Sequence, residues 1–199
     1  MRLFLIRHGE TAWTVAKRYQ GTTDIPLNSK GLRQAKGLAR WLAPEKPARI
    51  YSSTLRRARE TAKVIADRLH VKPVADARLN EICFGKWEGA FYPDLARTRG
   101  LEFRRWREGK LKRPPGGESV ASLARRVGKF LKEILDRHPE ETVALVSHGG
   151  PIKMFLFHVL KSLHSSIWSF RIDPASVSLI EGDRRLLQIT WTNRTDHLS

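Results

Sequence analysis

Short apolar runs alternate along this chain with stretches of helical hydrophobic spacing, and this alternation constrains the fold more than any other feature. Buried strands are predicted at residues 2–6, 49–52 and 142–147. Apolar residues at helical spacing predict helices over residues 32–42, 55–69, 120–134 and 152–160. An antiparallel hairpin is predicted at residues 176–181 and 186–191. This order predicts an α/β domain with a mixed, mainly parallel central sheet.

The length and composition predict a single domain over residues 1–199. The chain is 41% hydrophobic and 29% charged, which is enough for one sizeable core and short for two. The apolar run before Arg7 is too short for a signal peptide, and no run approaches transmembrane length. Cys83 is the only cysteine, which excludes an internal disulfide and a cysteine metal cage. We therefore expect a cytoplasmic protein.

The chain is strongly basic. Lysine and arginine number 37 against 20 aspartate and glutamate, which gives a formal net charge of +17. Such a field attracts anionic small molecules and nucleic acids alike. The excess is spread over short pairs and triplets, without the interleaved aromatics of an RNA-binding surface, so a solvated basic surface is favoured over a nucleic-acid interface. The oligomeric state stays open, with a homodimer as one option.

Residues 90–117 differ from the rest of the chain. They mix aromatic with basic residues and end in the run Pro114-Pro115-Gly116-Gly117, which breaks regular structure. We expect a helical cap over the site, because segments inserted on a rigid scaffold often carry substrate discrimination. Four aromatic side chains are candidates either for contact with the organic part of a substrate or for packing within the cap: Phe91, Tyr92, Phe103 and Trp106.

Arg7, His8 and Gly9 directly follow the first predicted strand. Ligands of open α/β sheets bind at the carboxyl ends of the strands, so a histidine nucleophile beside a guanidinium there is compatible with phosphoryl transfer. An ordinary strand end explains the tripeptide equally well.

His148 repeats this arrangement after the strand at residues 142–147. Gly149 and Gly150 lead from it into a predicted helix, and the unpaired N–H groups of such a turn favour a bound anion. Two histidines at strand ends of one parallel sheet can converge on one pocket. The remaining histidines lack this context and are expected to be structural or on the surface: His70, His138, His158, His164 and His197.

Two further segments supply a cation and a carboxylate. Arg57 lies at the junction between the strand at residues 49–52 and the next helix, and Glu81 lies in the segment 79–89. A guanidinium can donate two hydrogen bonds to a phosphate, and a carboxyl group can shuttle a proton. Judged singly, Arg57 is more simply an exposed helix charge and Glu81 a loop carboxylate.

Six motifs occur in a characteristic order: LIRHGETAW, YQGTTDIPLNSKGLRQA, YSSTLRRARETA, LNEICFGKWEG, PPGGES and VALVSHGG. Together they resemble the histidine phosphatase superfamily, also called the phosphoglycerate mutase-like family, from Met1 to about Trp168. The resemblance implies a three-layer α/β/α sandwich and a phosphoric monoester hydrolase of the histidine acid phosphatase type.

The resemblance also implies roles for particular residues. His8 is the implied nucleophile that takes up the phosphoryl group as phosphohistidine, and Arg7, Arg57 and His148 are implied to bind the equatorial oxygens. Glu81 is the implied proton donor. Fixed cations and N–H donors stabilise the charge on these oxygens, so neither a metal nor another cofactor is expected.

One position departs from the family pattern. Many relatives have Asn six residues beyond the nucleophile, where this chain has Thr14. A hydroxyl is shorter than an amide, so the contact with phosphate is left open between Thr14, Gln20 and the backbone of Gly21. Gly149 completes the expected substrate-binding set.

Within the family, the chain carries no extra segments of the kind that enclose a mutase site, which favours a metal-independent phosphomonoesterase over a cofactor-dependent phosphoglycerate mutase. The segments FGKWEG and SSIWSFRIDPASVSLIE look similar to those of phosphatases acting on α-ribazole 5′-phosphate in cobalamin biosynthesis and of broad-specificity relatives. A non-catalytic basic module that binds anions or nucleic acid is the alternative from another class. The expected partner is a phosphorylated small molecule, and no membrane partner is expected.

Overall fold

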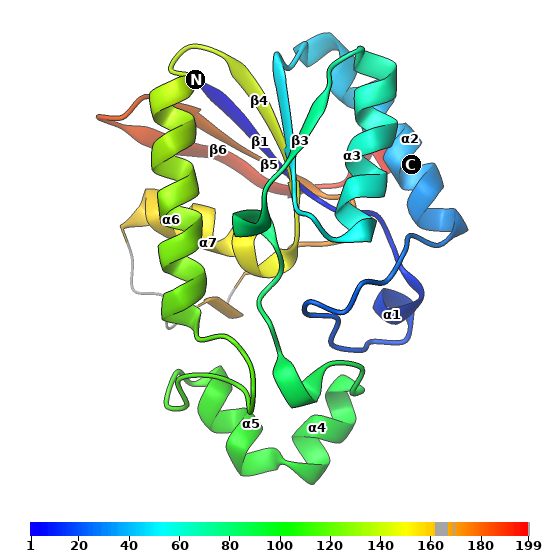
Figure 1. Ribbon diagram of the computed structural model, residues 1–199, viewed down its shortest axis with the longest axis vertical. Helices are drawn as coiled ribbons and strands as arrows, with labels where there is room; N and C mark the ends of the chain where they lie inside the picture. Colours follow the sequence, from blue (N-terminus) through cyan, green and yellow to red (C-terminus); the bar gives the residue numbers. More distant parts are fainter. Residues whose placement is uncertain (162–166, 169, 199) are drawn as a thin grey trace.

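The computed structural model describes residues 1–161, 167, 168 and 170–198, and in it a sheet lies between two layers of helices (Figure 1). The strands are β1 (Arg2–Arg7), β2 (Arg49–Ser52), β3 (Pro73–Ala75), β4 (Thr142–Ser147), β5 (Val177–Gly182) and β6 (Leu187–Arg194). Their order in the sheet is β3-β2-β4-β1-β5-β6. The first four of these strands run parallel to one another, whereas β5 is antiparallel to β1 and to β6. The predicted mixed, mainly parallel sheet is confirmed.

The apolar run of β1 is buried on both faces. Phe4 and Ile6 share one core with the helices α2 (Ser29–Leu42) and α3 (Arg56–Leu69). Leu3 and Leu5 share the other with α6 (Val120–Arg137) and α7 (Gly149–Leu160). Successive side chains of a strand point to opposite faces, so an unbroken apolar run is what a central strand between two helical layers requires. This confirms the three-layer α/β/α sandwich.

Some element ends differ from the sequence prediction. Helix α7 begins at Gly149, three residues before the predicted start at 152, because Pro151 is compatible with the first turn, where N–H groups have no partner within the helix. Strand β3 was not predicted, since its three residues are exposed and begin with Pro73. It adds to the edge of the sheet by pairing with β2.

Residues 90–117 contain the helices α4 (Tyr92–Thr98) and α5 (Gly100–Arg107), which lie below the layered part of the molecule in Figure 1. That this segment acts as a cap on the site stays a prediction. The shorter elements are α1 (Ala12–Val15), η1 (Ala43–Glu45), η2 (Ala77–Leu79), η3 (Gly85–Trp87) and η5 (Asp196–Leu198). None of the helices in the described part of the chain has the length and apolar character needed to cross a membrane.

Candidate active site

The carboxyl ends of β1 and β4 bring the two predicted site histidines together. His8 follows β1 and His148 follows β4, and these strands are parallel neighbours in register. Their imidazole ring centroids lie 5.0 Å apart. Residues far apart in the sequence therefore meet at one edge of the sheet, as the sequence predicted.

His8 has the tautomer that a nucleophile needs. Its Nδ1 donates a hydrogen bond to the carbonyl oxygen of Gly9 at 2.7 Å, which leaves the lone pair on Nε2. Burial lowers the pKa of His8 well below its ordinary value, and the cations Arg57 and Arg7 lower it further. The ring is therefore neutral at physiological pH. Gly9 is required beside it, because a Cβ there would lie 2.6 Å from the carbonyl oxygen of Gly31.

Arg57 is fully buried and held at three of its N–H groups. Its Nη2 donates to the carbonyl of Gly21 at 2.7 Å and its Nη1 to that of Thr23 at 2.8 Å. Its Nε donates to Nδ1 of His148 at 3.2 Å. Burial lowers the pKa of Arg57 to about 10, so the group stays cationic at neutral pH. One N–H on each terminal nitrogen remains to contact a phosphoryl oxygen.

Arg7 supplies the second cation. Its Nη1 donates to the carbonyl of Ile172 at 2.6 Å. Its Nε is buried and has no hydrogen-bond partner among the residues that the structure describes. Buried donors are almost always paired in folded proteins, so this N–H is a candidate contact for a bound anion.

Glu81 sits against the N-terminus of α7. Its Oε1 accepts hydrogen bonds from the backbone N–H of Gly150 at 3.1 Å and of Ile82 at 2.9 Å. Gly150 lies two residues after His148 and Ile82 directly follows Glu81, so these contacts fix the carboxyl group near the sheet edge that carries His8 and His148. Glu81 lines the same cavity as His8, Arg7 and Arg57.

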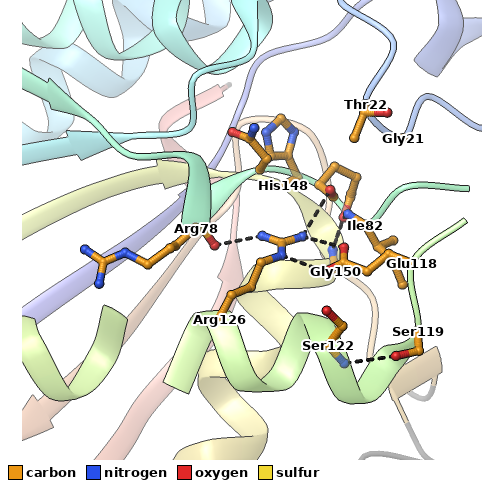
Figure 2. Close-up of polar contacts among 12 residues, drawn as sticks. Gly21, Thr22, Arg78, Ile82, Glu118, Ser119, Ser122, Arg126, His148 and Gly150 are labelled. Carbon is orange, nitrogen blue, oxygen red and sulfur yellow. Dashed lines mark hydrogen bonds and ion pairs between the residues drawn. The ribbon is translucent and has the colours of Figure 1, made fainter. Parts of the chain in front are cut away.

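Arg126 of α6 holds the segment that carries Glu81, and Figure 2 shows its contacts with Arg78 and Glu118. Its Nη1 donates to the carbonyl of Arg78 at 2.7 Å, and its Nη2 donates to the carbonyl of Glu81 at 3.1 Å. Its Nε and Nη2 also hold both oxygens of Glu118 at 2.9 Å. Sequence reasoning missed this role, because nothing local marks a mid-helix arginine as the partner of a distant loop.

His148 does not line the cavity, although the resemblance implied that it binds phosphoryl oxygens. Both of its ring nitrogens have protein partners. Nδ1 accepts from Arg57, and Nε2 donates to Oγ of Ser53 at 2.8 Å, whose hydroxyl in turn donates to Asn80 at 2.8 Å. These contacts position the guanidinium of Arg57. A direct contact of His148 with phosphate stays a prediction.

Glu88 holds the loop that carries Gly21 and Thr23. Its carboxylate accepts hydrogen bonds from the backbone N–H groups of Thr22, Thr23 and Phe84, each at 3.0 Å. The hydroxyls of both threonines donate to it as well. Burial raises the pKa of Glu88, but these hydrogen bonds outweigh burial and lower it. Glu88 belongs to the motif FGKWEG, which was the available signal for its importance.

The four residues expected to bind substrate separate into two groups. Gln20, Gly21 and Gly149 line the cavity, and Thr14 does not. The Thr14 hydroxyl takes part in the capping box of α1 with Thr11 and accepts a hydrogen bond from Nε2 of Gln20 at 3.0 Å. This hydrogen bond orients Gln20, which lines the cavity.

The cavity has a volume of about 450 Å³, and its lining includes His8 with the charged residues described above as well as several aromatic side chains. Of the aromatic candidates in the cap segment, Tyr92 and Phe103 line it. Trp106 is 1% exposed and packs against Trp168, with ring centroids 4.3 Å apart, so it belongs to the core. Phe91 is partly exposed and lies outside the cavity lining.

The other histidines in the described part of the chain lie outside this cavity, as expected. His138 bonds to the hydroxyl of Tyr51, His158 to the carbonyl of Ala124 and His197 to that of Ala175. His70 is an exposed helix C-cap, and His164 lies outside the described residues. Within the described ranges, no group of three or more His, Cys, Asp or Glu side chains is placed to hold a metal ion.

Comparison with known proteins identifies the family of this chain. The model of the histidine phosphatase superfamily (branch 1) matches residues 3–195. Phosphoserine phosphatase 1 of Hydrogenobacter thermophilus is 39% identical over 199 residues, which cover all of this chain and 94% of the relative. The adenosylcobalamin/α-ribazole phosphatase of Salmonella typhimurium is 32% identical over 182 residues, covering 91% of this chain and 90% of the relative.

A solved structure gives the same result for the fold. A mutant of phosphoserine phosphatase from Entamoeba histolytica, in complex with phosphoserine, matches with a TM-score of 0.90 and 29% identity. The match covers 100% of this chain and 99% of that one. The chain therefore belongs to the histidine phosphatase superfamily (branch 1), and its reaction class is phosphoric monoester hydrolysis.

Proposed function

We propose that this protein hydrolyses a small phosphate ester, without a metal ion, through a phosphohistidine on His8. The observation that carries the proposal is that a neutral imidazole, two guanidiniums and a carboxyl group line one cavity: His8, Arg7, Arg57 and Glu81. A phosphoryl group spreads negative charge over its equatorial oxygens, and preorganised cations stabilise that charge with no further cofactor.

The first step transfers the phosphoryl group. The lone pair on Nε2 of His8 forms a bond to phosphorus while the bond from phosphorus to the ester oxygen breaks. The carboxyl group of Glu81 gives its proton to the departing oxygen, so a neutral alcohol leaves. The free N–H groups of Arg57 and the Nε–H of Arg7 donate to the equatorial oxygens during the transfer.

The second step releases phosphate. The Glu81 carboxylate takes a proton from water as the water oxygen bonds to phosphorus, and the bond from phosphorus to nitrogen breaks. The electron pair returns to Nε2, and the hydrogen bond from Nδ1 to Gly9 keeps His8 in its starting tautomer. Glu81 thus acts first as an acid and then as a base.

The names of the relatives make several phosphate esters candidate substrates. Those reported above are named for phosphoserine and for α-ribazole phosphate, so both esters are candidates, the latter with a place in cobalamin biosynthesis. We expect the protein to act in the cytoplasm, because soluble phosphate esters of this kind occur there. Phosphate transfer between positions of phosphoglycerate, the mutase reaction, is the runner-up activity and is tested with the same protein.

Hydrolysis of p-nitrophenyl phosphate in the presence of EDTA tests the mechanism. We expect turnover that resists the chelator and is abolished in His8→Ala, with His70→Ala as the matched control at an exposed histidine. Loss of turnover with EDTA, or normal turnover in His8→Ala, would refute the proposal. Comparison of kcat/KM over phosphoserine, α-ribazole 5′-phosphate and nucleotides then ranks the substrates, and incubation with 3-phosphoglycerate detects mutase activity.

A further inference from the structure

We infer that Lys153, together with Arg107 and Trp168, forms a second anion-binding subsite that recognises a carboxylate on the organic part of the substrate. This inference rests on the proposed phosphatase function and extends it to a substrate class: small phosphate esters that also carry a carboxylate.

The position of Lys153 follows from the helix that carries it. Gly149 and Gly150 form the first turn of α7 and line the cavity. Residues three and four positions further along a helix lie on the same face, so Lys153 projects from the same side one turn later. This places its backbone about 5 Å along the helix axis from the N–H that holds Glu81. A carboxylate a few bonds beyond the ester oxygen lies within that reach.

Trp168 fixes the two cations of the subsite. The Nζ of Lys153 lies 5.3 Å from the centroid of the indole ring, and Cζ of Arg107 lies 5.7 Å from it. Both distances are those of cation–π contacts. All three residues line the cavity. The indole thus orders two long side chains that would otherwise lose rotamer entropy on binding an anion.

Lys153 is half-buried and has no hydrogen bond or ion pair with any described residue. Exposed lysines of this chain form ion pairs with carboxylates: Lys63 pairs with Asp67, and Lys110 pairs with Glu108. A half-buried ammonium that contacts only a ring face retains unused N–H donors. Desolvating such a group is costly unless an anion compensates it, so its position in a ligand cavity indicates a ligand contact.

The charges that line the cavity support a substrate with two anionic groups. The described lining residues include four cations, Arg7, Arg57, Arg107 and Lys153, and one carboxyl group, Glu81. Arg7 and Arg57 stand at the phosphate edge beside His8. Arg107, which also hydrogen-bonds the Tyr19 hydroxyl, and Lys153 are therefore left for a second anion. The nearby aromatic wall suits a small organic group rather than a second phosphate.

The titration of Lys153 gives the subsite a pH signature. Burial lowers the pKa of Lys153 to about 8, an effect that Glu81 opposes and that Arg7 and Arg107 reinforce. The ammonium is charged below this pKa and neutral above it. Preference for a carboxylate should therefore decline as the pH rises through about 8.

Two esters that differ only in the carboxylate test the inference: O-phosphoserine, which carries it, and O-phosphoethanolamine, which lacks it. In Lys153→Met we expect the ratio of their kcat/KM values to fall about tenfold or more, mainly through KM for phosphoserine. In Lys153→Arg the ratio should persist and lose its decline above pH 8. Lys132→Met, at an exposed lysine of α6, is the charge-matched control and should leave the ratio as in the native protein.

Binding to the His8→Ala protein supplies a readout that does not depend on turnover. Calorimetry should show tighter binding of 3-phosphoglycerate than of glycerol 3-phosphate, and Lys153→Met in that background should remove the difference. Equal effects of Lys153→Met on both members of each pair would overturn the subsite. Failure of the proposed function is a different result, namely absent hydrolysis of p-nitrophenyl phosphate or retained hydrolysis in His8→Ala.

Discussion

The Nε of Arg57 donates a hydrogen bond to Nδ1 of His148 at 3.2 Å, which links the cation of α3 to the histidine at the end of β4. Because Nδ1 is the acceptor, neutral His148 carries its proton on Nε2, where Ser53 accepts it. The orientation of the buried guanidinium thus depends on an imidazole, a hydroxyl and two backbone carbonyls at once.

Arg57→Lys should abolish most activity although it keeps the charge. An ammonium cannot reach the carbonyls of Gly21 and Thr23 and the imidazole of His148 while also meeting phosphate, because it lacks the planar fork of a guanidinium. We expect kcat/KM for p-nitrophenyl phosphate to fall about 100-fold or more. Arg56→Lys, at the exposed neighbouring position, is the control and should leave kcat/KM within about threefold of native. A near-native Arg57→Lys enzyme would contradict this role.

Glu88→Gln should weaken both the fold and the catalysis. The glutamine amide presents an NH₂ group to backbone N–H donors that the carboxylate now accepts, so at least one buried donor loses its partner. We expect the free energy of unfolding to fall by about 1–3 kcal/mol, measured by urea denaturation. We also expect kcat to fall because the loop with Gly21 and Thr23 supplies the carbonyls that hold Arg57. Unchanged stability would show that the loop does not depend on this carboxylate.

The Glu81→Gln substitution should slow hydrolysis more for esters with a more basic leaving group. A serine alkoxide needs a proton to depart, whereas p-nitrophenolate leaves without one. We therefore expect kcat to fall about 100-fold or more for phosphoserine and clearly less for p-nitrophenyl phosphate. Glu118→Gln, which disturbs the Arg126 contact but leaves the acid in place, provides the comparison. Equal losses on both esters in Glu81→Gln would exclude Glu81 as the proton donor.

The two buried imidazoles predict that stability declines in mild acid. Burial, followed by the nearby Arg57, lowers the pKa of both His8 and His148 well below the ordinary 6.5 that histidine has in the unfolded chain. Below pH 6.5 the unfolded state therefore binds more protons than the folded state. The free energy of unfolding should be highest above about pH 6.5 and should fall below it by up to about 1.4 kcal/mol per pH unit for each histidine.

Urea denaturation at about pH 7.5, 6.5 and 5.5 measures this pH dependence of the free energy of unfolding. The control variant His70→Gln, at an exposed histidine, should show the same dependence as the native protein. A free energy of unfolding that stays constant over this range would contradict buried neutral imidazoles. The same shift keeps His8 unprotonated as a nucleophile well below pH 6.5, so kcat/KM should show no loss from its protonation near that value.

The sequence determined the elements and the chemistry at their ends. Apolar alternation and helical spacing are local properties of a chain, so they located the central strands and the major helices and left the short edge strand β3 unpredicted. The motifs at the strand ends placed Arg7, His8 and His148 at one edge, because parallel neighbouring strands present their carboxyl ends together.

Only the tertiary structure decided how these groups are held. Three contacts join residues from separate elements: the hydrogen bond of Arg57 with His148, that of Arg126 with the carbonyl of Glu81, and the cation–π contact of Lys153 with Trp168. It also left His148 and Thr14 out of the cavity lining, and each of them hydrogen-bonds a residue that does line it, Arg57 and Gln20 respectively. Such contacts depend on long-range packing and on which donors become buried, and neither is encoded in the local periodicity of a sequence.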